Sequence, residues 1–120
     1  MKKKAIIISL KGLKLTNKEK ILLANEHPWG VILFKRNIKS FNQIKFLIKR
    51  VKKITKDKNF PILIDEEGST VSRLRDIISH EISANFFGKL FKKNKKLSIN
   101  LYKIYLNSLC KRLRKIGINI

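Results

Sequence analysis

Three short apolar runs lie in the first half of the chain, and amphipathic segments separate them. The runs are AIIISL at residues 5–10, VILF at residues 31–34 and PILI at residues 61–64. Unbroken apolar runs of this length, rich in β-branched residues, are typical of strands that are buried on both faces, as in parallel sheets. The pattern therefore predicts three strands of a parallel sheet.

The segments between these runs carry the signals of helices. Thr16 and Glu19 have the spacing of a capping box, which predicts a helix of about ten residues that ends before Pro28. Ser40 and Gln43 repeat the capping-box spacing. The apolar residues that follow recur every three or four positions, which predicts a helix with one buried face: Ile44, Leu47, Ile48, Val51 and Ile54.

The second half of the chain has a looser pattern. Residues 83–91 predict a short helical turn with four buried side chains, namely Phe86, Phe87, Leu90 and Phe91. A helical period resumes near Leu97, and its apolar face is formed by Leu101, Ile104, Tyr105, Leu109, Leu113 and Ile116. Gly117 is the predicted C-cap, with Ile118 as its hydrophobic partner, and residues 118–120 predict the start of a strand.

The order of the elements is strand, helix, strand, helix, strand, long loop, helix and the start of a strand. Repeated strand–helix units with apolar strands imply a parallel sheet with right-handed crossovers. The 120 residues suffice for one domain, 1–120. They hold about three and a half such units, whereas a closed (β/α)₈ barrel needs about 250 residues. The sequence thus predicts an α/β fold that is either a small open sheet or part of a barrel.

The chain is strongly basic, with 29 lysines and arginines against 8 acidic residues and a formal net charge of +21. Such a charge suggests a nucleic-acid partner or an anionic surface. The lysines are spread over every segment, however, and few aromatic residues are interleaved with them to stack on bases. We therefore favour a solvated lysine-rich surface over nucleic-acid binding, and keep binding to nucleic acid or an anionic surface as the alternative.

The sequence indicates neither a disulfide nor a membrane span. Cys110 is the single cysteine, so no intramolecular disulfide or thiolate metal cluster is expected, and it falls on the apolar side of the late helix, where we expect it to be buried. The start, MKKKAIIISL, has too short an apolar run for a signal peptide and reads as a strand. No segment approaches the roughly 20 apolar residues that a membrane span needs. We expect no membrane partner, metal or cofactor.

Three consecutive acids, Asp65, Glu66 and Glu67, follow the third apolar run. Ligands of α/β proteins bind beyond the carboxyl ends of parallel strands, so this stretch is the candidate site. A metal site built from the three acids alone is disfavoured, because oxygen-ligated cations usually draw on several loops. The alternative is that the three acids only add charge to the surface and keep the protein soluble.

Other polar and aromatic residues are weaker candidates for a functional role. His27 and His80 have no nucleophile nearby, so we expect structural roles for both. Trp29 could stack on a sugar ring, but a tryptophan beside a buried strand is more often part of the core. Arg36 and Asn37 follow the second strand and either support the site or form a plain turn.

Two motifs carry a family resemblance: GVILFKRNI at residues 30–38 and IDEEGSTVSRLR at residues 64–75. They are similar to the patterns GVILF-x-RN and D-[QE]-EGG-x-V-x-R of the family 3 glycoside hydrolases, in the branch of the bacterial β-N-acetylhexosaminidases. With HPWG before the first motif and ISANFFGKLF and RKIGINI after the second, the resemblance to the N-terminal part of these enzymes covers nearly the whole chain.

The resemblance implies a partial TIM-like (β/α)₈ barrel and a cytoplasmic protein. Family members are retaining enzymes that remove terminal β-linked N-acetylglucosamine, notably from cell-wall fragments that are being recycled. The matching positions imply that Asp65 and Arg73 bind the carbohydrate substrate. A carboxylate accepts hydrogen bonds from two hydroxyls, and a guanidinium supplies a fixed fork of donors.

The chain departs from the family pattern in two ways. Ser69 stands where a second glycine is usual, and Thr70 stands where a basic residue is frequent. In addition, no residue matches the family's nucleophilic aspartate or its histidine-bearing acid/base loop, so we assign no catalytic residue. Asp65 and Glu67 are a poor catalytic pair, because two positions apart in an extended chain they point the same way, whereas retaining hydrolysis needs carboxyl groups that face each other.

Besides part of a glycoside hydrolase and a basic binding protein, these departures suggest a third possibility, namely that the chain is a truncated product. An open parallel sheet exposes unpaired backbone groups and apolar side chains. We therefore expect self-association through the open sheet edges.

Overall fold

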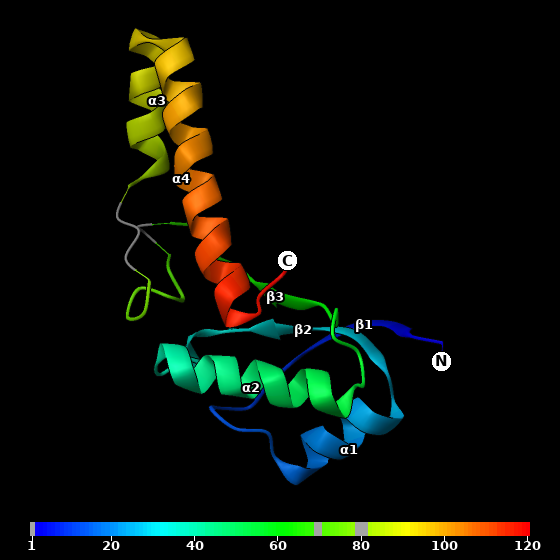
Figure 1. Cartoon of the computed structure of the whole chain (residues 1–120). Coiled ribbons are helices and arrows are strands. Elements are labelled where there is room, and N and C mark those ends of the chain that lie inside the picture. The colour runs from blue at the N-terminus through cyan, green and yellow to red at the C-terminus, as the bar shows by residue number, and fades with distance from the viewer. Residues whose placement is uncertain (1, 69–70, 79–81) are drawn as a thin grey trace.

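The structure is a computed structural model that describes residues 2–68, 71–78 and 82–120. Strands and helices alternate up to the third strand, and two helices follow it (Figure 1). Their bounds are β1 Lys4–Ser9, α1 Asn17–Asn25, β2 Pro28–Leu33, the 3₁₀ helix η1 Lys35–Asn37, α2 Phe41–Ile54, β3 Ile62–Ile64, α3 Ala84–Lys93 and α4 Lys95–Ile116.

In the described part of the chain, the three strands form one parallel sheet in the order β1-β2-β3. This confirms the predicted parallel strand–helix units. Residues 118–120, the expected start of a further strand, lie beside β3, in the position of a fourth strand. The amide of Ile120 donates to the carbonyl of Ile62 at 3.1 Å, and its carbonyl accepts from the amide of Ile64 at 3.3 Å. That alternation is the ladder of a parallel neighbour of β3.

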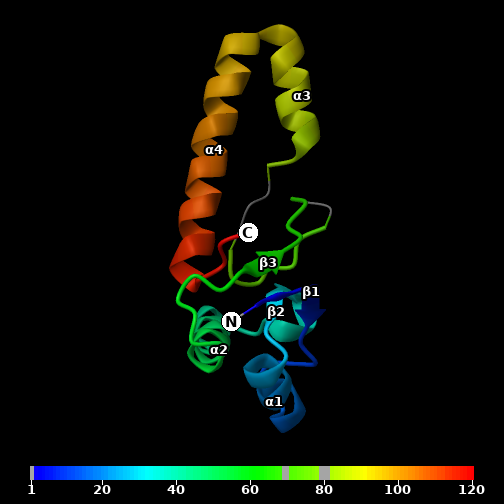
Figure 2. The ribbon, with the colours of Figure 1, turned by 90° about the vertical axis from the view of Figure 1, so that its right-hand side faces the viewer.

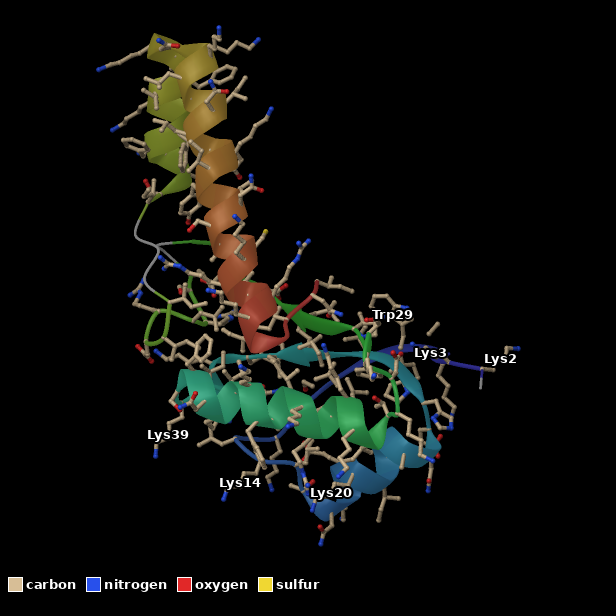
Figure 3. All side chains as sticks on the ribbon, viewed as in Figure 1. Lys2, Lys3, Lys14, Lys20, Trp29 and Lys39 are labelled. Carbon is tan, nitrogen blue, oxygen red and sulfur yellow. The ribbon has the colours of Figure 1, made fainter. Side chains whose placement is uncertain are left out.

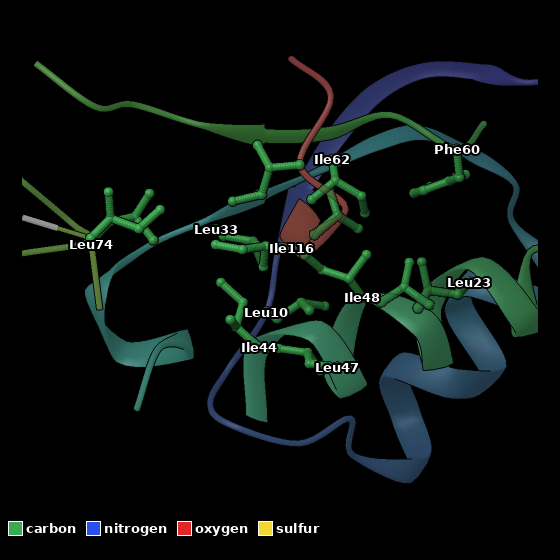
Figure 4. Close-up of a cluster of buried hydrophobic side chains, with 14 residues drawn as sticks. Leu10, Leu23, Leu33, Ile44, Leu47, Ile48, Phe60, Ile62, Leu74 and Ile116 are labelled. Carbon is green, nitrogen blue, oxygen red and sulfur yellow. The ribbon is translucent and has the colours of Figure 1, made fainter. Parts of the chain in front are cut away.

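The core lies between the sheet and the two helices α1 and α2 (Figure 4). The strand register brings Ile8, Val31 and Ile62 side by side on the helix-covered face. The predicted apolar face of α2 packs there, with Ile44, Leu47, Ile48 and Val51 all buried. The spacing of apolar residues in the sequence therefore determines which side of α2 meets the sheet.

The opposite face of the sheet is not covered in the same way. The register aligns Ser9, Ile32 and Leu63 on that face, and their side chains are exposed or half-buried. On β1, Ile6 and Ile7 are 54% and 46% exposed. The prediction of strands buried on both faces is therefore wrong for β1, because its outer edge is unpaired within the described residues and the described helices α1 and α2 pack on one face of the sheet only.

The two predicted capping boxes differ in outcome. In α1 the box is complete, because the Glu19 amide donates to Thr16 Oγ1 and the Thr16 amide donates to Glu19 Oε2. Burial alone would raise the pKa of Glu19, but bonds from the Lys11 and Thr16 amides outweigh it and the pKa is lowered. In α2 only half of the box forms, since Gln43 Oε1 accepts from the Lys39 amide instead of the cap residue.

The helices α3 and α4 form a hairpin that projects from the sheet, so the molecule is elongated, with extents of 53 × 29 × 19 Å (Figures 1 and 2). The hairpin is longer than the sequence predicted. It is held by Phe87, whose ring contacts those of Tyr102 and Tyr105. Within the described ranges, no helix is both long and apolar enough to cross a membrane.

Several burial predictions for the hairpin are wrong. Phe86 and Phe91 are 49% and 44% exposed, and of the four residues expected to be buried only Phe87 is fully so. Leu101 and Ile104 on α4 are exposed, as is Cys110. The apolar period of α4 reaches the core only through its last two turns, where Leu109, Leu113 and Ile116 pack, because the rest of the helix lies beyond the sheet.

The C-cap of α4 is the predicted glycine motif. Gly117 has φ of +108°, its amide donates to the carbonyl of Arg114, and the amide of Ile118 donates to the carbonyl of Leu113. These are the two bonds of a Schellman motif. A Cβ on Gly117 would lie 2.9 Å from Ile48 Cγ2. The backbone at the end of α4 thus passes so close to α2 that a side chain at position 117 would clash.

We therefore predict that Gly117→Ala lowers the free energy of unfolding by about 1–3 kcal/mol, because alanine resists the positive φ and would clash with Ile48. Gly88→Ala is the matched control, since a Cβ there meets open space and alanine favours the helix. Denaturant unfolding checks both variants, and equal or reversed effects would contradict the role of the cap.

We also propose that the chain self-associates through the open edge of β1. Replacing Ile7 by Lys puts a charge on this edge and should reduce the associated fraction in sedimentation velocity. The control Ile104→Lys removes an exposed isoleucine, 65% accessible, from a helix instead of a strand. If both variants or neither became monomeric, the β1 edge would not be the contact.

Candidate functional site

The carboxyl ends of the three parallel strands lie at the same end of the sheet. Asn37 connects the backbone that follows β1 to the backbone that follows β2. Its side chain is fully buried. Its amide nitrogen donates to the carbonyls of Leu10 and Gly12 at 3.0 Å, and its oxygen accepts from the Phe34 amide at 2.9 Å. Asn37 thereby joins the residues that follow β1 to those that follow β2.

Arg36 reinforces this connection from the surface. Its Nε donates to the carbonyl of Leu10 at 2.9 Å, and its guanidinium lies 4.7 Å from the centre of the Phe34 ring. Arg36 and Asn37 thus belong to the 3₁₀ helix η1 and also hold the strand ends, while their support of the site stays a prediction.

The three acids after β3 have three different environments. The Asp65 side chain is exposed and has no hydrogen bond or ion pair with another described residue. Glu66 Oε2 accepts from the backbone amides of Arg73 and Leu74 at 2.9 and 3.1 Å. Glu67 is exposed, and its backbone amide donates to the carbonyl of Val71 at 3.1 Å. The middle acid therefore closes the loop, and Asp65 is left available to a ligand.

Arg73 is held in place by this loop. Its own amide is bound by Glu66, and the next residue, Leu74, is fully buried in the core. Its Nε is buried and has no hydrogen-bond partner within the described residues. A buried donor without a partner is rare in proteins and calls for an explanation. It makes Arg73 a second candidate for contact with a ligand.

Helix α4 borders the same loop. The pKa of Tyr105 is raised, first by burial and then by the negative charge of Glu66. The hydroxyl therefore stays protonated and able to donate well above neutral pH. The loop after β3 is thus framed by the sheet edge on one side and by α4 on the other.

The remaining sequence candidates lie apart from this edge. Trp29 begins β2, at the opposite end from the site, and is 39% exposed, so the expectation of a core residue is wrong. His27 has φ of +46°, and its carbonyl accepts from the Lys4 amide, which fits the structural role expected for it. His80, Ser69 and Thr70 lie outside the described residues.

No metal site appears in the part of the chain that the structure describes, where no cluster of three His, Cys, Asp or Glu side chains could hold an ion. Sequence reasoning missed the loop-closing role of Glu66. Nothing in the order Asp-Glu-Glu distinguishes the middle acid, because its partners are backbone amides seven and eight positions away.

Known proteins with similar sequences share one description. No family model matches the chain. A β-hexosaminidase of Psychromonas ingrahamii is 35% identical over 89 residues, which cover 74% of this chain and 25% of the relative. A β-hexosaminidase of Haemophilus influenzae is 40% identical over 72 residues, which cover 60% of this chain and 20% of the relative.

Solved structures agree with the sequence relatives. NagZ from Neisseria gonorrhoeae, solved in complex with N-trifluoroacetyl-D-glucosamine, superposes with a TM-score of 0.84 and 26% identity, over 97% of this chain and 34% of that one. A family 3 β-N-acetylglucosaminidase from Paenibacillus has the same fold, with a TM-score of 0.82, over 94% of this chain and 21% of that one.

In sequence the chain is similar to part of the β-hexosaminidases, and in fold it is similar to part of the β-N-acetylglucosaminidases of glycoside hydrolase family 3. Within that family it resembles the bacterial β-hexosaminidases, as the two motifs predicted. The chain spans only about a fifth to a third of the length of these relatives.

The structure predicts that Glu66→Ala frees the loop that carries Arg73. Hydrogen exchange at the amides of Arg73 and Leu74 should become about 10- to 100-fold faster, because each loses a charged acceptor. Glu67→Ala is the control, since it removes a neighbouring charge whose side chain bonds no described residue. Unchanged protection in Glu66→Ala would show that the loop is held by other contacts.

Proposed function

We propose that the chain forms part of the sugar pocket of a β-N-acetylhexosaminidase, with Asp65 and Arg73 as substrate-binding residues. The likeness to NagZ, which was solved with an N-acetylglucosamine analogue, supports a substrate that contains N-acetylglucosamine. The substrates in question are terminal β-linked residues, such as those of cell-wall fragments recycled in the cytoplasm.

The pairing of one free acceptor with one free donor carries this proposal. Asp65 offers carboxylate oxygens, and Arg73 offers a buried Nε–H, and neither group is satisfied by a described residue. A sugar hydroxyl both donates and accepts hydrogen bonds, so a sugar can offer a partner to each group. The backbone of Arg73 and Leu74 is bound to Glu66 before any ligand arrives, which lowers the ordering cost of binding at these two residues.

The chemical step belongs to groups outside these 120 residues. Retaining hydrolysis needs a nucleophilic carboxylate and an acid/base about 5 Å apart on opposite sides of the scissile bond. Asp65 and Glu67 leave the same strand end, and Glu66 is bound to two backbone amides. This part of the barrel would therefore bind and orient the sugar, while residues elsewhere in the enzyme break the bond.

We predict that the chain binds N-acetylglucosamine weakly and that Asp65→Ala weakens binding about 10- to 100-fold, the range for losing bonds to a charged group. Amide chemical shifts recorded during a titration with the sugar measure the affinity. Asp76→Ala is the matched control, because Asp76 is 65% exposed and only pairs with Lys35 across 3.6 Å at the surface.

The same preparations test the catalytic part of the proposal. An aryl N-acetyl-β-glucosaminide should not be hydrolysed by this chain. Hydrolysis that disappears in Asp65→Ala would place the chemistry here and contradict the proposal. Sugar binding that is equal in the Asp65 and Asp76 variants would remove Asp65 from the pocket.

A further inference from the structure

A groove lies between α1, α2 and the loop that follows β1. Its apolar lining is formed by Leu13, Leu15, Phe46 and Leu47. Its volume is about 260 Å³, which is slightly below the range of pockets that enclose a small molecule. The groove is therefore suited to receive part of a larger partner.

Among the residues that the structure describes, three basic side chains and no acidic one line this groove. They are Lys14 from the loop, Lys20 from α1 and Arg50 from α2. Figure 3 shows Lys14 and Lys20 together at the end of the molecule away from the α3–α4 hairpin. The nearby acid on α1, Glu19, is bound by the amides of Lys11 and Thr16. Its carboxylate therefore faces the loop, and the charged side chains that line the groove are basic.

An exposed aromatic side chain stands beside these cations. Phe46 is 61% exposed, and the Arg50 guanidinium lies 6.0 Å from the centre of its ring. A large apolar side chain that is open to water next to basic residues is the arrangement of proteins that bind membrane surfaces. Double-stranded nucleic acid would use the cations, but its bases are already stacked in the duplex and give this phenylalanine nothing comparable to bury against.

The side chains that line the groove come from two helices and the loop before them. Its walls are α1 and α2, which are consecutive helices packed on the same three-stranded sheet. Further strands can join that sheet only beside β1 or beside β3, so they would not cover the space between these two helices. Its exposure is thus not a consequence of the sheet's open edges.

We propose that this groove docks the protein onto an anionic phospholipid bilayer. Lys14, Lys20 and Arg50 would bind lipid phosphates, and Phe46 would enter the boundary between headgroups and acyl chains. This is peripheral binding, in contrast to the expectation of no membrane partner that the lack of a spanning segment suggested. It does not rest on the proposed sugar site, because neither Asp65 nor Arg73 lines the groove.

Flotation with lipid vesicles tests the proposal, because aggregated protein sinks while vesicle-bound protein rises. The chain should float with phosphatidylcholine vesicles that contain phosphatidylglycerol and not with phosphatidylcholine alone. The triple variant Lys14→Gln, Lys20→Gln and Arg50→Gln should lower the partition coefficient on the order of 100-fold, given the contribution of each basic residue near a charged surface.

Two matched controls separate the groove from the overall charge of the chain. Lys103→Gln, Lys111→Gln and Arg114→Gln remove the same charge from exposed positions of α4 and should lower partitioning less than about fivefold. Phe46→Ser should weaken binding, whereas Ile104→Ser, at a similarly exposed isoleucine, should not. Equal losses in the two triple variants, or an unaffected Phe46→Ser, would overturn the proposal.

Two competitors distinguish other anionic partners. Glycerol phosphate that displaces the protein fully from vesicles would indicate a pocket for a free headgroup instead of a bilayer contact. Double-stranded DNA that binds through the groove cations, while vesicles do not, would assign the groove to nucleic acid. The proposal expects neither result, because only a bilayer also buries Phe46.

Discussion

The parallel pairing of β2 with β1 and β3 is the constraint on which the rest of the structure depends. Because the three strands run the same way, the residues that follow them meet at one edge of the sheet. Asn37 fixes two of these ends to each other, and Glu66 shapes the loop after the third. The exposed Asp65 and the buried Nε of Arg73 reach their positions only through this arrangement.

The two faces of the sheet differ, because helices cover one of them and leave side chains on the other partly accessible. Helices α1 and α2 bury Val31 and Ile62 on one face, while Ile32 and Leu63 on the other remain partly accessible. In a closed (β/α)₈ barrel the inward side chains fill the interior in layers. We therefore expect the open face and the free edge of β1 to favour self-association, whereas the residues that line the groove between the two helices belong to neither.

Local signals in the sequence predicted most of the fold but not its burial. The capping box at Thr16, the apolar face of α2 and the Gly117 cap all depend on residues within a few positions of one another. The exposure of Ile7 and Ile104 depends on which elements are present to cover them, and that is a tertiary property. For the site, the motif indicated Asp65 and Arg73, but the bonds from Glu66 to distant amides have no local pattern.

The side-chain nitrogen of Arg73 offers the most direct test of the central claim, which is that an unpaired donor and an unpaired carboxylate at the end of β3 receive a sugar. The Nε–H resonance of Arg73 can be followed by NMR while N-acetylglucosamine is added. The account predicts a saturable shift of this resonance that Asp65→Ala greatly weakens. A resonance that stays unchanged while the sugar binds elsewhere on the chain would contradict it.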